Sequence, residues 1–277
     1  MSEYILNLLP LHEGEREEFE AIAPDAVHVY ARRSTVTAEQ LAAATIIFGW
    51  PREESMKEAV SLKWFQSMWA GTEEYNGCLP QGVIFTSSSG SNSRSVAEHM
   101  LTGLMAVCRR LPTYLDSQRA HVWKDEGPMK TILGGTVLVI GAGHVGADFA
   151  RLCQGLGART IGLKRRIAGP IGGFDEVRTM DELDQLLPPA DVVALPLPHS
   201  PQTVGRMNER RIALMKDGAV LISAGRGTVL DQDALVKVMQ AGKLWGAALD
   251  VTDPEPLPPD SPLWDVPNLL LTPHVAG

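Results

Sequence analysis

Four charged or titratable side chains stand in three short polar segments, and their types are those used in acid–base and anion chemistry. Arg226 lies in the segment SAGRG, Asp250 and Glu255 lie in DVTDPEP, and His274 lies in TPH. Histidine exchanges a proton near neutral pH, a neighbouring carboxylate favours its protonated form, and a guanidinium pairs with carboxylates. Taken singly, each residue is also typical of a surface ion pair, a solvated loop acid or a capped core histidine. Their occurrence together favours a site.

Each polar segment follows a short apolar run that predicts a β-strand, namely Ala219–Ser223, Gly246–Leu249 and Leu269–Leu271. In open parallel sheets, ligands bind beyond the carboxyl ends of the strands. Because all three segments occupy that position, we expect Arg226, the acids and His274 to lie near one another at one edge of a sheet.

A glycine-rich turn indicates a nucleotide site. The predicted strand Thr136–Ile140 runs directly into GAGHVG, and a helical pattern follows it. In such a turn the first glycine makes the tight bend, the second lets the backbone approach a pyrophosphate, and the third permits close packing of helix on strand. The strand before and the helix after favour a dinucleotide site over a glycine-rich turn without a ligand. The turn consists of Gly141, Ala142, Gly143, His144, Val145 and Gly146.

A basic triplet follows the next predicted strand, Thr160–Leu163. In a site that prefers NAD, an acid about 20 residues beyond the glycines binds the ribose 2′-hydroxyl. Here Lys164, Arg165 and Arg166 occupy that region. A carboxylate would repel a 2′-phosphate, whereas a guanidinium binds it with two hydrogen bonds. The triplet therefore predicts a preference for NADP(H), and NAD(H) remains the alternative if the triplet is only an exposed turn.

The elements that must position these residues form two series. Residues 1–94 alternate short apolar runs with helical patterns, which predicts parallel βαβ units. A helix over Ser95–Arg110 then leads to a second series of six predicted strands separated by helices, as in a dinucleotide-binding sheet. The fold class expected is α/β with two Rossmann-like parallel-sheet domains. The strands predicted in the first series are Tyr4–Leu9, Val27–Tyr30, Thr45–Gly49, Leu62–Met68 and Val83–Thr86, and Val192–Leu195 completes the second.

The motifs VAEH, GAGHVG, SAGRGTVLD, ALDVTDPEPLP and LTPHVAG occur in this order, and the chain from about Ala70 onward resembles the D-isomer-specific 2-hydroxyacid dehydrogenases. The resemblance implies a flavodoxin-like substrate (catalytic) domain over residues 1–94 and an NAD(P)-binding domain over residues 95–273, separated by a cleft. Residues 274–277 would begin a return to the substrate domain that is truncated here. It also implies a homodimer built by the helices that link the domains.

Residue roles follow from the same resemblance. Arg226 matches the substrate arginine, Glu255 the acid, and His274 the acid/base histidine. Asp250 matches the residue that holds the nicotinamide carboxamide, and Ala70-Gly71 resembles the loop whose amides bind the substrate carboxylate. Further cofactor contacts are expected from Pro196, Thr203, Ala224, Gly225 and His274.

These roles predict an NADPH-preferring reductase of small 2-oxo acids, similar to the glyoxylate/hydroxypyruvate reductase branch. His274 would act as general acid, and Arg226 would stabilise charge on the carbonyl oxygen. Trp69, next to Ala70-Gly71, fits a small substrate but equally an aromatic one such as phenylpyruvate. Two further alternatives are a non-catalytic nucleotide-sensing binding module and a truncated, inactive paralogue.

Composition excludes several other classes. The chain has 277 residues and a formal net charge of −8, and no long run of Lys or Arg favours a nucleic-acid surface. Its longest apolar runs are too short to span a membrane, and its N-terminus lacks a signal-peptide pattern, so a cytoplasmic protein is expected. Cys78, Cys108 and Cys153 form no CxxC pair and predict small buried side chains rather than disulfides. No metal site is predicted.

Overall fold

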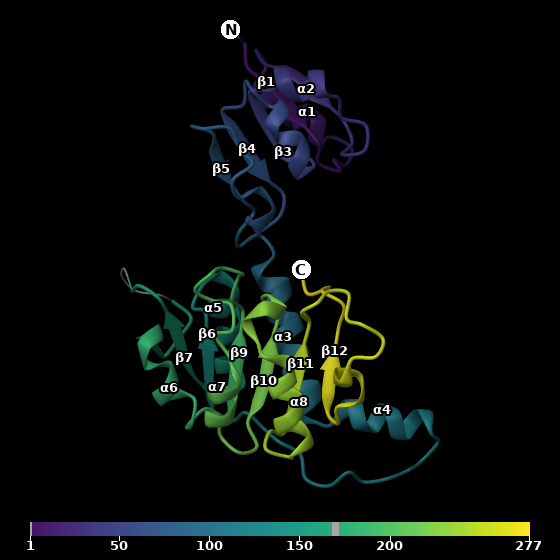
Figure 1. The fold of residues 1–277 in the computed structure, drawn as a ribbon, viewed down its shortest axis with the longest axis vertical. Coiled ribbons are helices and arrows are strands. Elements are labelled where there is room, and N and C mark those ends of the chain that lie inside the picture. Colours follow the sequence, from purple (N-terminus) through teal and green to yellow (C-terminus); the bar gives the residue numbers. More distant parts are fainter. Residues whose placement is uncertain (1, 168–171) are drawn as a thin grey trace. The chain divides into compact units, whose positions relative to one another are not determined.

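The computed structural model describes residues 2–167 and 172–277. The chain divides into two compact units, Met1–Ser91 and Asn92–Gly277, which we call unit 1 and unit 2. This division falls immediately before helix α3 (Ser93–Cys108), close to the boundary expected at residues 94/95. Each unit contains its own parallel β-sheet, visible in Figure 1. The predicted α/β class with two parallel-sheet units is therefore confirmed.

Unit 1 is built on a five-stranded parallel sheet with the strand order β2-β1-β3-β4-β5, which is the flavodoxin-like order. The segment between β3 and β4 forms a 3-10 helix, η1 (Glu53–Glu58), which buries Met56. The strands are β1 (Tyr4–Asn7), β2 (Val27–Tyr30), β3 (Ile46–Gly49), β4 (Trp64–Ser67) and β5 (Ile84–Thr86); the helices are α1 (Glu15–Ile22), α2 (Ala38–Ala43) and the 3-10 helix η2 (Glu73–Tyr75).

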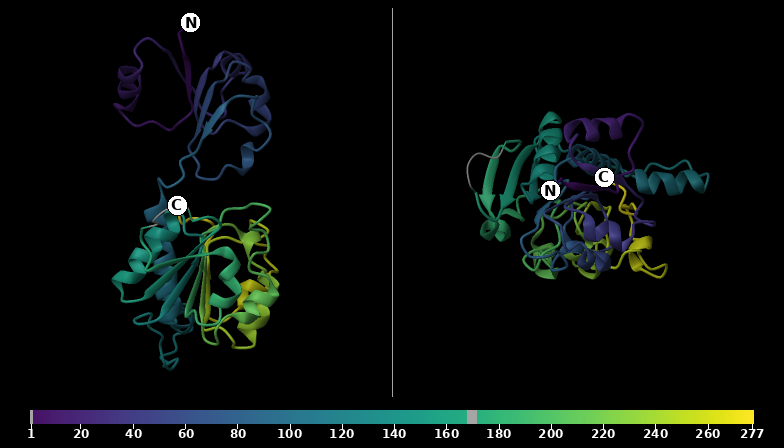
Figure 2. Two further views of the ribbon diagram at one scale, coloured as in Figure 1. Left: turned by 90° about the vertical axis from the view of Figure 1, so that its left-hand side faces the viewer. Right: turned by 90° about the horizontal axis from the view of Figure 1, so that it is seen from above.

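Alternation along β3 assigns the two faces of this sheet. Ile47 is fully buried in a core with Leu41 of α2, whereas Phe48 meets Phe19 of α1 edge to face, with ring centroids 5.3 Å apart. Successive side chains of a strand point to opposite faces, so α1 and α2 cover opposite faces of the sheet. Figure 2 shows the two helices on either side of it.

Unit 2 is built on a seven-stranded parallel sheet with the order β12-β11-β10-β9-β6-β7-β8. Six strands were predicted; the seventh, Glu176–Thr179, lies at the edge beside β7 and carries alternating charged residues rather than an apolar run. The strands are β6 (Thr136–Ile140), β7 (Arg159–Lys164), β8 (Glu176–Thr179), β9 (Val192–Leu195), β10 (Val220–Ser223), β11 (Gly246–Leu249) and β12 (Leu269–Leu271).

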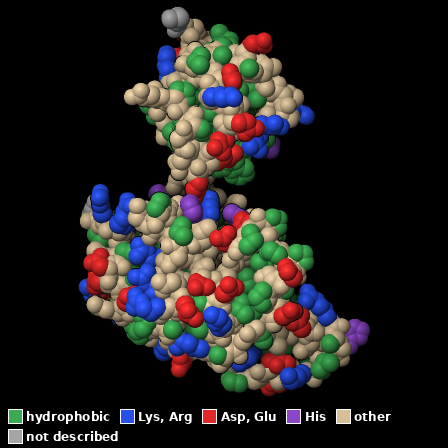
Figure 3. Space-filling model, viewed as in Figure 1, with side chains coloured by type: hydrophobic (Ala, Val, Ile, Leu, Met, Phe, Trp, Pro, Cys, Tyr) green, Lys and Arg blue, Asp and Glu red, His purple; other side chains and the backbone are tan. Residues whose placement is uncertain are grey.

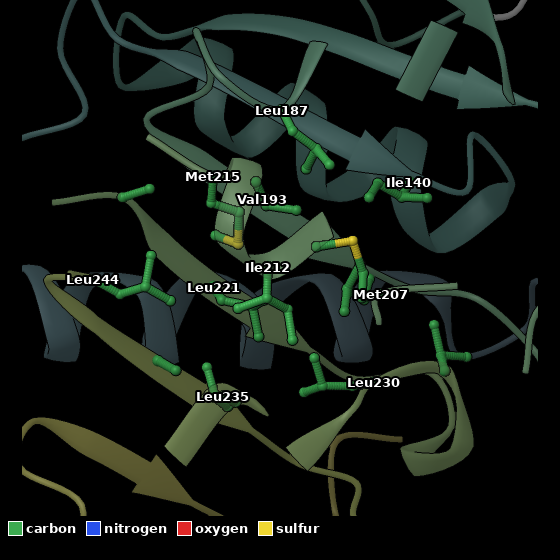
Figure 4. Close-up of a cluster of buried hydrophobic side chains, with 14 of the residues drawn as sticks. Ile140, Leu187, Val193, Met207, Ile212, Met215, Leu221, Leu230, Leu235 and Leu244 are labelled. Carbon is green, nitrogen blue, oxygen red and sulfur yellow. The ribbon is translucent and has the colours of Figure 1, made fainter. Parts of the chain in front are cut away.

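Two hydrophobic cores enclose this sheet, one on each face. In β6, Leu138 and Ile140 contribute to one core, and Val137 and Val139 contribute to the other. Figure 4 shows part of the first core, where Ile140 lies among side chains of neighbouring strands and helices. Strands that are buried on both faces read as continuous apolar runs, which is why these strands are visible in the sequence.

Helices α3 and α5 (His144–Gly155) share one core, and helices α7 (Glu209–Leu214) and α8 (Gln232–Gln240) supply side chains to the other. Helix α4 (Leu111–Arg119) was not predicted, and it has no buried residue. The remaining helices are α6 (Leu183–Leu186), α7 (Glu209–Leu214), α8 (Gln232–Gln240) and the 3-10 helices η3 (Met180–Glu182), η4 (Gly227–Val229) and η5 (Pro262–Asp265). Among the described residues, no helix is long and apolar enough to span a membrane.

Candidate active site

Three neighbouring strands of unit 2 bring the polar segments together. β10, β11 and β12 lie side by side and run parallel, so the loops that follow them leave the same edge of the sheet. Arg226 follows β10, Glu255 follows β11, and His274 follows β12. The juxtaposition expected from the sequence therefore occurs within unit 2.

His274 and Glu255 form a hydrogen-bonded pair. The Nδ1 atom of His274 lies 2.8 Å from Oε2 of Glu255, and the two side chains are 45% and 38% exposed. The other carboxylate oxygen of Glu255 accepts a hydrogen bond from the amide of Thr252 at 2.9 Å, which fixes the orientation of the carboxylate. His274 has a φ of 54°, in the left-handed region that few non-glycine residues adopt.

Asp250 stabilises the backbone around His274. Its side chain is almost fully buried, and its two oxygens accept hydrogen bonds from the amides of Val275 and Ala276, both at 3.0 Å. The hydroxyl of Thr272 donates to the same carboxylate at 2.6 Å, and the backbone carbonyl of Asp250 accepts from the amide of His274. These bonds give Asp250 a positioning role in addition to the cofactor contact expected from the sequence.

His99, on helix α3, extends this network and was not assigned a role from the sequence. Its Nε2 lies 2.9 Å from the hydroxyl of Thr272 and 3.5 Å from the carboxylate of Asp250. The only signal for it was its place in the VAEH motif, more than 150 residues before its partners. Through these contacts α3 is tied to the loop that carries His274.

Two glycines set the position of Arg226. A Cβ atom at Gly225 would lie 2.1 Å from the carbonyl oxygen of Leu197, and one at Gly227 would lie 2.0 Å from the carbonyl of Thr252. Only glycine permits such close backbone approach, so the SAGRG loop is held between the loops after β9 and β11. The guanidinium of Arg226 donates to the carbonyl of Gly225 at 2.9 Å.

A pocket of about 500 Å³ lies beside the histidine–glutamate pair within unit 2. Leu257, Trp264 and Leu271 form part of its apolar lining, and the polar members include Glu255 and His274. The indole of Trp264 is oriented by a 2.8 Å hydrogen bond from its Nε1 to the carbonyl of Pro258. The volume is in the range of small-molecule sites.

The glycine-rich turn has the geometry that a dinucleotide requires. Gly141 adopts a φ of +125°, and a Cβ at Gly146 would lie 2.2 Å from the carbonyl oxygen of Gly141. At Gly143, in contrast, a Cβ would meet no atom within 4 Å. The surface there is open, as expected where a pyrophosphate approaches the backbone and the amides at the start of α5. The described residues of the turn therefore fit a dinucleotide.

The loop after β9 approaches the same turn. The carbonyl oxygen of Pro196 lies 3.4 Å from the Cβ position of Gly141, and Leu197 contacts both Gly141 and Gly225. Thr203 uses its hydroxyl locally, donating to the carbonyl of Pro198 at 2.7 Å. The structure thus brings Pro196, the glycine turn and the SAGRG loop together.

Lys164, Arg165 and Arg166 are exposed at the end of β7. The nearest following acid in the chain, Asp175, is engaged elsewhere: its carboxylate accepts from the amide of Thr160 at 2.7 Å and from its hydroxyl at 3.0 Å. These hydrogen bonds, first that from the Thr160 amide, hold the pKa of Asp175 below its usual value. The basic triplet is accordingly positioned as the sequence predicted, and its preference for a 2′-phosphate stays a prediction.

Ala70 and Gly71 belong to unit 1, where they follow β4. The amide of Trp69 donates to the buried hydroxyl of Ser67 at 3.1 Å, and the carbonyl of Trp69 accepts a hydrogen bond from the amide of Ser88. The loop is thereby fixed to the sheet of unit 1, while Ala70 is exposed.

The cysteines contribute no reactive group near these loops. Cys108 and Cys153 are buried, and burial raises the pKa of Cys108 to about 11 and that of Cys153 to about 12. Cys78 is partly buried, and burial also raises its pKa. Within the residues that the structure describes, no group of three His, Cys, Asp or Glu side chains could hold a metal ion.

These features define an α/β protein with a dinucleotide turn beside a histidine–carboxylate pair, a combination typical of nucleotide-dependent oxidoreductases. The sequence model of the D-isomer specific 2-hydroxyacid dehydrogenase NAD binding domain matches residues 101–276. The chain belongs to the D-isomer specific 2-hydroxyacid dehydrogenase family and carries its NAD-binding domain.

Individual relatives agree. The D-3-phosphoglycerate dehydrogenase of Haemophilus influenzae is 36% identical over 209 residues, which cover 74% of this chain and 50% of that protein. The chain spans no more than about half the length of the D-3-phosphoglycerate dehydrogenases that it matches.

Two solved structures extend the comparison. A D-isomer specific 2-hydroxyacid dehydrogenase family protein from Aeromonas salmonicida has a TM-score of 0.86 and 29% identity, covering 100% of this chain and 90% of that one. A family member from Xanthobacter autotrophicus, solved with NADPH and MES, has a TM-score of 0.83 and 27% identity, covering 100% and 89%.

Proposed function

We propose that this protein is an NADPH-preferring reductase that converts small 2-oxo acids of the glyoxylate/hydroxypyruvate type to D-2-hydroxy acids. The observation that carries the proposal is the hydrogen-bonded His274–Glu255 pair at the rim of a pocket, on loops adjoining that of Arg226. Membership in the family supports the general reaction.

Each residue has a defined task in this proposal. When bound, the reduced nicotinamide supplies a hydride to the carbonyl carbon of the substrate. His274 turns Nδ1 toward Glu255, so Nε2 is the ring nitrogen that donates a proton to the carbonyl oxygen. Glu255 orients the ring through its hydrogen bond with Nδ1, and Arg226 pairs with the substrate carboxylate and stabilises negative charge on the carbonyl oxygen.

Cofactor binding is assigned to the glycine turn and the basic triplet. The amides at the start of α5 would receive the pyrophosphate, and Lys164 with Arg165 would pair with the 2′-phosphate. The relative from Xanthobacter autotrophicus, whose structure contains NADPH, supports a phosphorylated cofactor. NADH is the competing cofactor.

The test is oxidation of NADPH and, in parallel, of NADH by the purified chain with glyoxylate, hydroxypyruvate, pyruvate or phenylpyruvate. Faster turnover with NADPH and a small acid is the expected result, and His274→Gln should abolish it. Faster turnover with phenylpyruvate would favour the aromatic alternative, for which Trp264 in the pocket lining is the supporting observation. Binding of NADPH without turnover of any acid would favour the nucleotide-sensing module or the inactive paralogue.

The names of the relatives suggest one additional assay. Because the chain matches D-3-phosphoglycerate dehydrogenases, oxidation of D-3-phosphoglycerate with NADP or NAD belongs in the same experiment. Turnover of this acid in preference to glyoxylate and hydroxypyruvate would replace the proposed substrate class with a phosphorylated one.

We further propose that the protein forms a homodimer through α4 and the segment that follows it. Leu111, Leu115 and Val122 are each about half exposed, and Trp123 is fully exposed. Figure 3 shows hydrophobic side chains on the surface of the unit that contains α4. Clustered exposed apolar side chains are typical of interfaces. Light scattering should give the mass of two chains, and Trp123→Asp with Leu115→Asp should give that of one.

A further inference from the structure

We infer that unit 1 contains an anion-binding site that takes the phosphate group of a small phosphorylated molecule. The site is a groove of about 1030 Å³. Four arginines line it, namely Arg16, Arg32, Arg33 and Arg52. The inference concerns binding only and does not depend on the proposed reaction.

The groove lies where a sheet of this topology places its ligands. Its lining follows the ends of three parallel strands: Leu8–His12 after β1, Ala31–Thr35 after β2, and Trp50 with Arg52 after β3. β1 pairs with β2 on one side and β3 on the other, so the strand order reverses at β1. In open α/β sheets the crevice beyond the carboxyl ends at such a reversal is the usual ligand site.

The distribution of charge in unit 1 is uneven. Residues 1–91 contain thirteen Asp and Glu against six Lys and Arg, so the unit as a whole is acidic. All four of its arginines nevertheless line this one groove, and among the described residues that line it there is no Asp or Glu. An acidic unit that collects its arginines in one concave surface attracts anions there rather than cations.

Two donors at the groove lack an acceptor within the described part of the chain. Asn7, only 2% exposed, accepts from the amide of Leu9 at 2.9 Å through Oδ1, but its Nδ2 has no partner. Arg33 pairs with Glu74 through Nη2 at 3.3 Å, whereas its buried Nε has no partner. A buried donor without an acceptor is costly, and the oxygen of an anion is an acceptor that would relieve this cost.

Two of the four arginines are also held in a defined orientation by neighbouring side chains. The guanidinium of Arg16 lies over the ring of Tyr30, 4.7 Å from its centroid, and Arg33 is held by Glu74. A planar guanidinium binds oxyanions with two parallel hydrogen bonds. A phosphate monoester offers three oxygens and up to two charges, so it engages more of these donors than a single carboxylate does.

The test is calorimetric titration of the full chain with inorganic phosphate at constant ionic strength. Arg32→Gln or Arg52→Gln should each weaken binding about tenfold, the usual effect of losing one charge-assisted hydrogen bond, and the double variant should weaken it further. Both side chains are exposed, so neither change disturbs the core. Arg33 is left intact because it pairs with Glu74.

Two controls separate this site from other sources of binding. Lys57→Gln removes one positive charge from the same unit outside the groove, and Lys237→Gln removes one from the exposed surface of α8 in unit 2; both should leave phosphate affinity unchanged. Equal phosphate binding by the wild type and the Arg32→Gln/Arg52→Gln variant would overturn the inference. A loss with either control as large as with the groove variants would also overturn it, as would succinate binding as tightly as phosphate.

Discussion

In each unit, the groups that we expect to bind an anionic ligand lie beyond the carboxyl ends of the parallel strands. The two units differ in the kind of group that they use. In unit 2 these groups include backbone amides held by glycines at fixed spacing, and side chains on loops that the buried carboxylate of Asp250 helps to fix. In unit 1 they are largely arginine side chains from three separate loops. Where backbone amides bind the ligand, a substitution in the site can also change the stability of the fold. Where exposed side chains bind it, a substitution in the site should leave the fold almost unchanged.

The sharpest test of this contrast is a pair of glycine variants in unit 2. Gly146→Ala should lower the free energy of unfolding by about 3 kcal/mol, because its Cβ would lie 2.2 Å from the carbonyl oxygen of Gly141. Gly143→Ala should change it by less than about 0.5 kcal/mol, because its Cβ meets no atom within 4 Å, yet should weaken NADPH binding. Urea unfolding and NADPH titration measure the two quantities. Equal stability of the two variants would contradict the assignment of separate roles.

A second variant tests the buried carboxylate. Asp250→Asn should cost about 2 kcal/mol of stability and lower the turnover of any active substrate, because an amide group would face backbone donors that now bond to a carboxylate. Thermal unfolding and kcat provide the measurements. Asp253→Asn, an exposed acid in the adjacent loop, is the matched control and should change neither.

The basic triplet should affect cofactor choice without affecting the fold. Lys164→Asp together with Arg165→Ala should lower the ratio of kcat/KM for NADPH to that for NADH about tenfold, since a 2′-phosphate loses its charge-assisted partners. Lys237→Ala, on α8, serves as the control. An unchanged ratio would mean that these cations do not face the 2′-phosphate.

Acid should destabilise both units, because the pKa of Glu3 in unit 1 is also lowered, first by its hydrogen bond from Lys63, but more of the carboxyls with a lowered pKa lie in unit 2. In unit 2, hydrogen bonds from Arg210 and Arg211 lower the pKa of Asp184, and the pKa values of Asp175, Glu176 and Asp191 are also lowered. A lowered pKa stabilises the folded state above the ordinary carboxyl pKa of about 4, and this contribution disappears as the pH falls through the lowered value.

Asp184→Asn should therefore destabilise the protein by less than about 1 kcal/mol at pH 7, the scale of solvent-exposed pairs, and the difference from wild type should shrink as the pH falls below about 4. Urea unfolding across this pH range measures it. A difference that persisted at the acid end would point to lost packing instead of lost charge.

The smallest effect is expected in unit 1. Arg52→Gln should change the free energy of unfolding by no more than about 0.5 kcal/mol, because Arg52 is exposed and contributes to a groove instead of a core. Chemical denaturation gives the value. A loss comparable to that of Gly146→Ala would remove the contrast between the units.

The same contrast explains what the sequence revealed. Strands buried on both faces, such as Val192–Leu195, were predicted with the correct bounds, because a short continuous apolar run is typical of such a strand. The glycine turn was predicted from the separate backbone roles of its three glycines, and the SAGRG loop from its arginine following an apolar strand and from its match to a family motif; the close contacts at Gly225 and Gly227 are found only in the structure. These features depend on residues that are close together in the chain, so a single sequence is enough to predict them.

Features that depend on distant partners were missed. β8 is an edge strand with the sequence EVRT, which carries no apolar pattern, and α4 buries no residue. The link from His99 to Thr272 joins residues far apart in the chain. The arginines of the unit 1 groove likewise come from three loops at no regular spacing, so only the folded sheet brings them together.

The backbone of His274 restricts how this position can vary among relatives. At a φ of 54°, β-branched residues are strongly disfavoured, while asparagine and aspartate join histidine as the side chains that tolerate this region. The backbone conformation therefore limits which residues can occupy position 274, independently of any requirement for proton transfer. In a relative that no longer needs the proposed proton transfer, we expect asparagine or glycine at this position, because both residues would preserve the conformation of the loop.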